Sequence, residues 1–384
     1  MLKQVVPGTE TPALLPDDLS RDIHCVLGLP IDANGMATAL QRIRSAARGG
    51  VPFLVSTANL NFLTSSLQSG TFRDSLIESD LCTVDGAPIL WLAHLLGIPL
   101  TERVAGSDLF ACLAAAPAFE PLPVFFFGGS DGAGEAACRS LSGSKGLKGV
   151  GAINPGYGSL DELSSDRFID AINASKARFL IVALGAAKGQ AWLLRNHHRL
   201  QVPVRAHLGA TVNFQAGGVK RAPTALRHAG LEWLWRIKEE PHLWRRYWAD
   251  GRALVRLLVT RALPLAWHLA RHRMQCGENC AFKVRTVQRG RSVVLQLSGH
   301  ATARHIARAI VHFRNGINLS GERLVVDLSG LDFIDTRFFG LLLMVTKQLR
   351  ARGTELELVG ASAKIEKLFR LNELGYLIAA TRGE

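Results

Sequence analysis

The chain has 384 residues, of which 48% are hydrophobic and 20% are charged, an ordinary composition for a globular protein. Lysine and arginine number 45 against 32 acidic residues, so the net charge of +13 suggests a polyanionic partner: nucleic acid, an anionic membrane face or a phosphorylated substrate. Six scattered cysteines exclude a disulfide-stapled secreted domain, and the lack of 18 consecutive uncharged apolar residues argues against a transmembrane span.

Residues 1–20 carry prolines and acids and no apolar segment of a secretory signal, so they predict a loose arm on a cytoplasmic protein. Beyond them, short apolar runs alternate with helical patterns. Five of these runs are predicted strands: Val51–Ser56, Val124–Gly128, Val150–Ile153, Phe179–Leu184 and Val204–Leu208. Because several are continuously apolar and precede glycine-rich turns, they indicate an α/β fold: a Rossmann-like, mostly parallel sheet with flanking helices and a ligand site at the strands' carboxyl ends.

Residues 231–275 differ in character, because they hold five of the seven tryptophans. Arginines and aliphatic residues alternate from Arg245 onward with a single acid, Asp250. Such a pattern is typical of an amphipathic helix in an anionic membrane interface. Binding to nucleic acid or packing on the protein itself are the alternatives. Pro264 is expected to kink or end the helix.

A second, smaller α/β domain is predicted after a linker near residues 271–281. Its expected strands are Phe282–Val287, Ser292–Leu297, Arg323–Asp327 and Glu355–Val359, with a turn over residues 288–291. Its expected helices run from about Ala301 to Asn315, Thr336 to Arg352 and Ser362 to Leu371. About 100 residues is a normal size for one hydrophobic core.

Three polar groups follow predicted strands or turns of the first domain. Thr57 and Asn59 follow a strand, where they either bind a ligand or cap the next helix. Asp85, before Gly86, is either a general base held at a rigid turn or a helix cap. Arg103 can pair with a phosphate or form a surface salt bridge.

His272, Cys276 and Cys280 are spaced four residues apart, so on a helix they would lie on one face as candidate metal ligands. Structural zinc takes four protein ligands from shorter cysteine spacings, and Gly277 weakens a helix through these positions. The sequence therefore predicts no metal ligand.

The order of these motifs, with the run from Arg221 to Tyr247, resembles the WecG/TagA/CpsF family, glycosyltransferase family 26. The resemblance extends from about Ile23 to Asp250. It implies an inverting, metal-independent hexosyltransferase without a cofactor. Such an enzyme moves an N-acetylmannosamine-type or glucose-type sugar from a UDP-sugar to a polyprenyl-diphosphate-linked saccharide. It would be peripheral, on the cytoplasmic face of the bacterial inner membrane, in cell-surface polysaccharide biosynthesis.

The resemblance also implies roles for residues. Asp85 falls on the proposed general base, and Thr57, Asn59 and Arg103 fall on pocket positions. The arginines thought to close over the diphosphate are Arg236 and Arg245 or Arg246.

Three positions depart from the family pattern. Gly189 stands where the family has glutamine, unless the loop shifts by one residue and Gln190 serves. His242 stands where it has a closing arginine, and Asn154 where it has histidine. These departures place the donor identity in question.

The stretch from Leu324 to Thr336 resembles a STAS domain, the fold of anti-sigma-factor antagonists, over about Phe282 to Ile378. In that family the hydroxyl residue at the helix start is phosphorylated by a partner kinase, which implies Thr336 here. Phe338 replaces the usual small residue. The alternative is that Asp335 and Thr336 only cap the helix.

The predicted division is an arm (1–20), a glycosyltransferase domain (21–244), a basic membrane-interface segment and linker (245–280) and a STAS domain (281–384). The predicted partners are a UDP-sugar, the lipid-linked acceptor, an anionic membrane and a protein bound through the STAS domain, but not nucleic acid. The alternative function is a non-catalytic scaffold or regulatory protein whose transferase domain has decayed.

Overall fold

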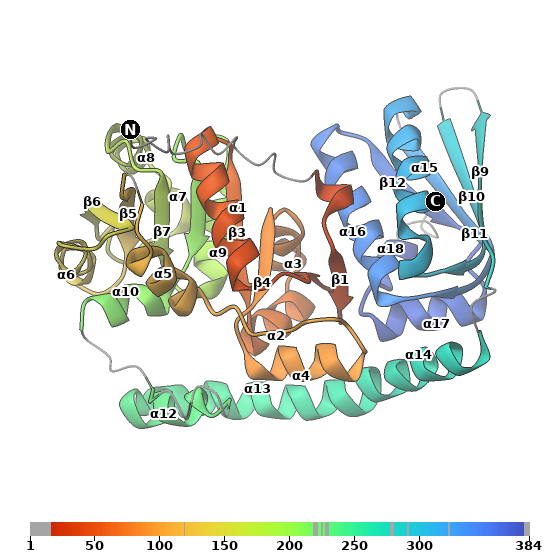
Figure 1. The fold of residues 1–384 in the computed structure, drawn as a ribbon, viewed down its shortest axis with the longest axis horizontal. Helices are drawn as coiled ribbons and strands as arrows, with labels where there is room; N and C mark the ends of the chain where they lie inside the picture. The colour runs from red at the N-terminus through yellow and green to blue at the C-terminus, as the bar shows by residue number, and fades with distance from the viewer. Residues whose placement is uncertain are drawn as a thin grey trace, which may run out of the picture.

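A computed structural model describes residues 17–118, 120–217, 222–223, 226, 230–276, 280–289, 292–321 and 323–379. Figure 1 shows an α/β body built by the first half of the chain beside a smaller α/β body at the carboxyl end, with one long helical run beneath both. Parts of several predictions lie outside the described residues: residues 1–16 of the arm, residues 221, 224–225 and 227–229 of the family motif, residues 277–279 of the linker, the turn centre at 290–291 and residues 380–384 of the STAS domain.

The larger sheet has six strands in the order β4-β3-β8-β7-β5-β6, and every neighbouring pair is parallel. Its strands are β3 (Phe53–Ala58), β4 (Leu81–Val84), β5 (Leu122–Gly128), β6 (Leu147–Ile153), β7 (Phe179–Ala183) and β8 (Val204–His207). All five predicted strands of this region are confirmed. The four-residue β4 was missed because so short an apolar run does not distinguish a strand from a helix.

Helices cover both faces of this sheet, as the continuously apolar strands require. Phe126 faces a core shared with α1 (Met36–Gly49), α5 (Gly106–Ala115), α6 (Ala133–Ser140) and α10 (Gly209–Gln215). Phe125 and Phe127 point to the opposite face, where α8 (Asp166–Ala174) and α9 (Ala186–Arg195) pack. The remaining helices of the first half are α2 (Leu60–Gln68), α3 (Gly70–Ile77), α4 (Ala87–Leu95) and α7 (Leu160–Leu163).

A buried hairpin, β1 (Ile23–Val26) and β2 (Leu29–Asp32), lies between the two bodies. Asp32 fixes it there: its carboxylate accepts hydrogen bonds from Arg21 at 2.7 Å, Arg42 at 2.9 Å and the Cys82 amide at 2.7 Å. The preceding turn, η1 (Asp18–Ser20), buries Leu19 in the core. The prediction of a loose arm was therefore wrong for residues 18–20.

The smaller sheet has the order β12-β11-β10-β9, in which only the β9–β10 pair is antiparallel. Its elements are β9 (Phe282–Arg289), β10 (Ser292–Ala301), η4 (Ala303–His305), α15 (Ile306–Leu319), β11 (Arg323–Ile334), α16 (Thr336–Ala351), β12 (Glu355–Val359), α17 (Ala363–Leu371) and α18 (Tyr376–Ala379). The predicted order is confirmed. The first helix was wrongly placed at Ala301, because β10 extends to that residue and a 3-10 turn follows.

Helix α16 connects the two bodies. It is buried over nearly its whole length and packs on β1, where Arg337 donates hydrogen bonds to the carbonyl oxygens of Arg21 at 2.8 Å and Ile23 at 3.3 Å. One hydrophobic cluster includes residues of the hairpin, α16 and the smaller sheet. The carboxyl-terminal body is therefore packed on the first by a shared core.

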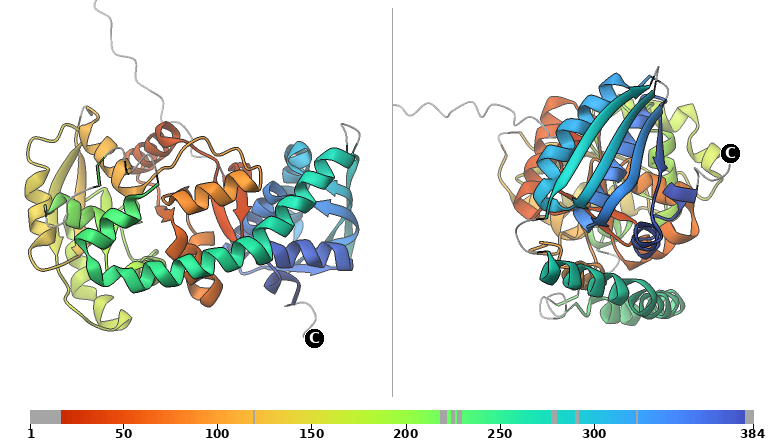
Figure 2. Two further views of the ribbon diagram at one scale, coloured as in Figure 1. Left: turned by 90° about the horizontal axis from the view of Figure 1, so that it is seen from below. Right: turned by 90° about the vertical axis from the view of Figure 1, so that its right-hand side faces the viewer.

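The long helical run consists of α13 (Trp244–Leu257), a π turn (Leu258–Ala262) and α14 (Leu263–Gln275), and α12 (Glu232–Glu239) and the turn η2 (Pro241–Leu243) precede it. Figure 2 shows it crossing the molecule from the first body to the second. Pro264 does not end the helix, because it occupies the first turn of α14, where its missing amide hydrogen is tolerated. Among the described residues, this run is the one helix long and apolar enough to cross a membrane by length and composition.

Candidate active site

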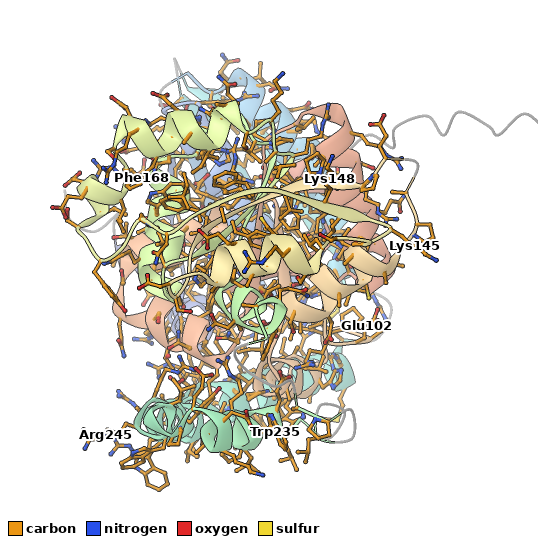
Figure 3. All side chains as sticks on the ribbon, turned by 90° about the vertical axis from the view of Figure 1, so that its left-hand side faces the viewer. Glu102, Lys145, Lys148, Phe168, Trp235 and Arg245 are labelled. Atoms are coloured by element: carbon orange, nitrogen blue, oxygen red, sulfur yellow. A yellow bond between two sulfur atoms is a disulfide. The ribbon has the colours of Figure 1, made fainter. Side chains whose placement is uncertain are left out.

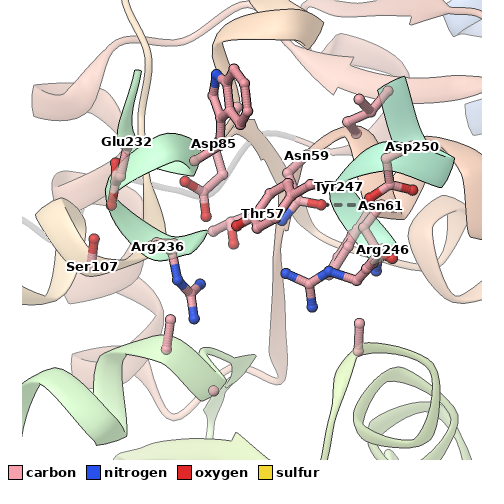
Figure 4. A pocket seen from close by; sticks show the side chains of 18 of the residues that line it. Thr57, Asn59, Asn61, Asp85, Ser107, Glu232, Arg236, Arg246, Tyr247 and Asp250 are labelled. Atoms are coloured by element: carbon pink, nitrogen blue, oxygen red, sulfur yellow. Dashed lines mark hydrogen bonds between the residues drawn. The ribbon is translucent and has the colours of Figure 1, made fainter. Parts of the chain in front are cut away.

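A cavity of about 710 Å³ opens at the carboxyl ends of the parallel strands, between the sheet and the helices α12 and α13. Its size lies in the range of small-molecule sites. Figure 4 shows side chains from both sides of the cavity pointing into it. The polar lining comes from Thr57, Asn59, Asn61, Asp85, Arg103, Ser107, Ser130, His207, Thr211, Asn213, Glu232, Arg236, Arg246, Tyr247 and Asp250.

Asp85 lies in this cavity directly after β4. Its amide donates to the Ala58 carbonyl oxygen at 2.8 Å, so the β3–β4 ladder continues to this residue and holds it. Burial raises the pKa of Asp85 to about 6, while the Arg103 charge and a hydrogen bond from the Gly106 amide act in the opposite direction. The group is a carboxylate at neutral pH and a stronger base than an exposed aspartate.

Arg103 stands beside Asp85 and is held by two other carboxylates. It donates to Glu232 at 2.9 Å and to Asp108 at 3.2 Å, and it contacts the Asp85 carbonyl oxygen at 3.3 Å. Glu232 belongs to α12, so this ion pair ties the helices over the cavity to its floor. Arg103 is thus a cationic group in the cavity wall that can pair with an anionic ligand.

Thr57 and Asn59 lie on the β3 side of the cavity. The Asn59 side chain accepts a hydrogen bond from the Phe62 amide at 3.1 Å and caps α2. The capping role of Asn59 is therefore confirmed, and the residue also lines the cavity, where ligand binding stays a prediction. Thr57 is buried, with its side chain toward the cavity.

The C-terminal arginines divide into two groups. Arg236 and Arg246 point into the cavity from α12 and α13, and Arg236 donates to Glu240 at 2.6 Å. Arg245 does not line the cavity, because its position on α13 directs it outward over Trp244 (Figure 3). Of the predicted pair, Arg246 is the cavity residue. The side chain of His242 lies outside the described set.

Gln190 is not a cavity residue either. It is fully buried on α9 and donates to the Ser56 hydroxyl at 2.9 Å, behind the strand end. The suggestion that it replaces the family glutamine was wrong, since its helix face turns it toward the sheet.

A side chain from β8 fills the space beside Gly189. A Cβ there would overlap the ring of His207, so the imidazole occupies the space that a side chain at 189 would take. His207 lines the cavity, is nine-tenths buried, and its Nε2 atom has no partner among the described residues. Burial lowers the pKa of His207 to about 4, so a neutral imidazole faces the ligand space. No sequence motif marks His207, because only the fold brings it beside Gly189.

Thr336 lies outside this cavity. It is the first residue of α16, and Asp335 caps that helix by accepting a hydrogen bond from the Phe338 amide at 2.9 Å. Thr336 is only 6% exposed, because α16 is packed between the two bodies. The capping role is confirmed for Asp335, while phosphorylation of Thr336 stays a prediction and would require that packing to open.

Comparison with known proteins agrees with this geometry. Residues 24–266 match the profile of the Glycosyl transferase WecG/TagA/CpsF family, and residues 284–379 match that of the Mlab, STAS domain. An N-acetylglucosaminyldiphosphoundecaprenol N-acetyl-beta-D-mannosaminyltransferase of Bacillus spizizenii is 28% identical over 194 residues, or 50% of this chain and 73% of the relative. The enzyme of that name from Staphylococcus aureus strain MRSA252 is 24% identical over 215 residues, or 55% and 82%.

Solved structures of anti-sigma-factor antagonists are similar to the smaller body. The anti-sigma factor antagonist SpoIIAA in its unphosphorylated form is 23% identical, covers 26% of this chain and 85% of its own, and has a TM-score of 0.23. An anti-sigma-factor antagonist STAS domain from Rhodobacter sphaeroides is 22% identical, covers 23% and 99%, and has a TM-score of 0.20. With its profile match over most of its length, the chain belongs to the WecG/TagA/CpsF family of glycosyltransferases and carries a C-terminal STAS domain.

Proposed function

We propose that this protein transfers a hexose-type sugar, of the N-acetylmannosamine or glucose kind, from a UDP-sugar to a polyprenyl-diphosphate-linked saccharide, with inversion at the anomeric carbon. The observation that carries the proposal is the placement of Asp85 in a cavity of nucleotide-sugar size beside Arg103, with Arg236 and Arg246 across it. The curated relatives are named for a reaction of this class.

The chemistry follows from these charges. Asp85 accepts the proton of the acceptor hydroxyl, whose oxygen forms the new bond to the anomeric carbon. The bond from that carbon to the diphosphate oxygen breaks, and UDP leaves with additional negative charge. Arg103, Arg236 and Arg246 are cations that can stabilise this charge, so we expect transfer without a divalent metal.

Transfer of radiolabel from a panel of UDP-hexoses into organic-extractable lipid tests the proposal. With purified protein and bacterial membranes, one donor is expected to label lipid, and the same donor is expected to do so in EDTA. If no donor labels lipid and calorimetry detects no UDP binding, the proposal is wrong and the scaffold alternative takes its place.

The outer face of α13 and α14 supports the proposal that the protein binds to a membrane surface. Large apolar side chains there are exposed, among them Trp248 at 63% and Trp267 at 55%. The exposed set is Trp244, Trp248, Val255, Val259, Leu263, Trp267 and Met274. Leu257, Leu265 and Leu269 are buried on the opposite side. Tryptophan is enriched at membrane–water interfaces, because its ring is apolar and its N–H group can bond to water.

The π turn keeps this stripe on one face. A regular α-helix turns by about 100° per residue, so a stripe spaced like this one would drift around a helix of this length. The π turn at Leu258–Ala262 holds one extra residue and removes about 100° of rotation. Leu263 and Trp267 are thereby brought back into line with Trp244 and Trp248. Exposed arginines flank the stripe along one side: Arg245, Arg252, Arg256 and Arg271.

We therefore propose that the enzyme is peripheral, with this face on anionic lipid at the cytoplasmic side of the bacterial inner membrane. Each arginine near such a surface contributes about 1 kcal/mol. In this orientation the cavity beneath α12 and α13 lies close to the headgroups that carry the acceptor.

Replacing both Trp248 and Trp267 with glutamate is expected to weaken binding to phosphatidylglycerol-containing vesicles by about 100-fold or more, because each buried apolar side chain contributes about 1.5–3 kcal/mol and about 1.4 kcal/mol is a factor of ten. Co-sedimentation measures the change. Val311→Glu is the control, since Val311 is 53% exposed on α15, on the side of the molecule opposite the long helix in Figure 1. Equal binding by the double variant and the control would contradict the membrane face.

A further inference from the structure

Two cysteines and two histidines meet where the long helix ends and the STAS domain begins. His272 and Cys276 lie at the end of α14, Cys280 lies just before β9, and His300 lies on β10. One ligand atom from each of the four residues lies within 4.8 Å of the others, and all four residues are half-buried. The sequence pattern indicated three of them, and the fourth, His300, enters from a distant strand.

Backbone hydrogen bonds explain why these four side chains lie close together. The Cys276 amide donates to the His272 carbonyl oxygen at 2.8 Å, so the two side chains are one helical turn apart. The β9–β10 ladder places Phe282 opposite Gly299, and the His300 amide donates to the Ala281 carbonyl oxygen at 3.0 Å. Cys280 is therefore held beside His300 by strand register.

The ring of His300 contacts both His272 and Cys276. His272 Nε2 lies 2.9 Å from His300 Nδ1, and Cys276 Sγ lies 3.6 Å from both ring nitrogens of His300. The His272 ring stacks on Phe333, with centroids 3.7 Å apart and an interplanar angle of 8°, which fixes its rotamer. Ligands on a tetrahedral zinc ion, at about 2.3 Å for sulfur and 2.0 Å for nitrogen, lie about 3.5 Å apart.

In the structure Cys276 and Cys280 form a disulfide. A disulfide uses the two cysteines and leaves the convergence of two histidines on the same point without a role. We propose that in the reduced protein His272, Cys276, Cys280 and His300 together bind one Zn²⁺ ion. The ion would be held by two thiolates and two neutral imidazoles, with the two thiol protons released on binding. Four protein ligands make a closed, structural site.

This site would tie the end of the membrane-facing helix to the central region of the STAS sheet. Helix α14 packs on α17 of the smaller body, and a metal bridge would in addition fix the end of this helix to β10. Its role is structural, and it is separate from the sugar-transfer cavity near β3 and β4.

Metal analysis of the full chain tests the inference. Protein produced with zinc in the medium and purified in a phosphine reductant is expected to contain about one zinc per chain by mass spectrometry. Cys276→Ser and His300→Ala are each expected to lose it. The matched controls Cys112→Ser and His198→Ala change exposed residues away from the cluster and are expected to keep it.

A spectroscopic measurement on the unmodified chain covers the case in which the variants do not fold. Cobalt added to metal-free, reduced protein is expected to give intense visible bands of a tetrahedral ion and a thiolate-to-cobalt charge-transfer band. Zinc is expected to abolish these bands and to protect two of the six cysteines from thiol reagents. Six thiols that react after denaturation verify that the tested protein is fully reduced. If such protein binds neither cobalt nor zinc, the proposal is wrong.

Discussion

Replacing Asp85 with asparagine is expected to lower the rate of sugar transfer by about 10²–10⁴-fold, the usual contribution of a general base. Asparagine has nearly the same shape and keeps the acceptor side of the hydrogen bond from the Gly106 amide, but it cannot take a proton. The fold is expected to persist, because the backbone of residue 85, not its side chain, continues the ladder. Initial rates of lipid labelling with the active donor measure the effect.

Asp170→Asn is the matched control, because it makes the same chemical change at an exposed position of α8, outside the cavity. UDP binding by calorimetry is expected to stay within a few-fold of wild type in both variants, since the base does not hold the nucleotide.

The wild-type pH profile gives a second check. With a raised pKa of about 6, Asp85 is ionised above that value, so kcat/KM is expected to fall about tenfold per pH unit below it. An active Asp85→Asn enzyme would rule out Asp85 as the base.

All strands of the two sheets except β4 were predictable, because each is a short apolar run bounded by glycine or polar turns. The hairpin β1–β2 was not predicted. Its eight residues are all buried, and that burial depends on α16, which lies more than 300 residues away. Local patterning cannot report a partner at that distance. Likewise, the π turn at Leu258–Ala262 follows from how α13 and α14 pack on the two bodies, whereas the sequence marks only Pro264.

For the site, family resemblance placed Asp85, Thr57, Asn59, Arg103 and Arg236 correctly in the cavity. It did not separate Arg245 from Arg246, because adjacent residues on a helix point about 100° apart and the choice depends on the helix's rotation. His207 was missed for a different reason. Its importance comes from the space left by Gly189, and only three-dimensional contact connects the two.

The packing of α16 limits which face of the STAS domain is open to a partner. The helix that begins at Thr336 is covered by β1 of the transferase, with Arg337 bonded to two of its carbonyl oxygens. A protein partner would therefore have to use another face of the STAS domain, or displace the transferase from α16. The STAS domain therefore shares a hydrophobic core with the rest of the protein.

Replacing Gly340 with alanine is expected to destabilise the protein by about 1–3 kcal/mol, the usual cost of overpacking a core. Gly340 is the point of closest approach between α16 and the hairpin, and a Cβ there would overlap the Ile23 carbonyl oxygen. That oxygen cannot move away, because β1 is paired with β2 and fixed by Arg337. The cost should therefore exceed the ordinary gain from replacing a helical glycine with alanine, which is up to about 1 kcal/mol. Thermal unfolding measures the shift.

Gly251→Ala makes the same substitution in another helix, α13, where a Cβ meets nothing within 4 Å. It is expected to leave the melting temperature unchanged or to raise it slightly, so the difference between the two variants isolates the contact with Ile23. Hydrogen exchange locates the effect: in Gly340→Ala the amides of β1 and α16 should lose protection while those of β5 and β7 keep it. A melting temperature raised equally in both variants would mean that α16 does not rest on the hairpin at Gly340.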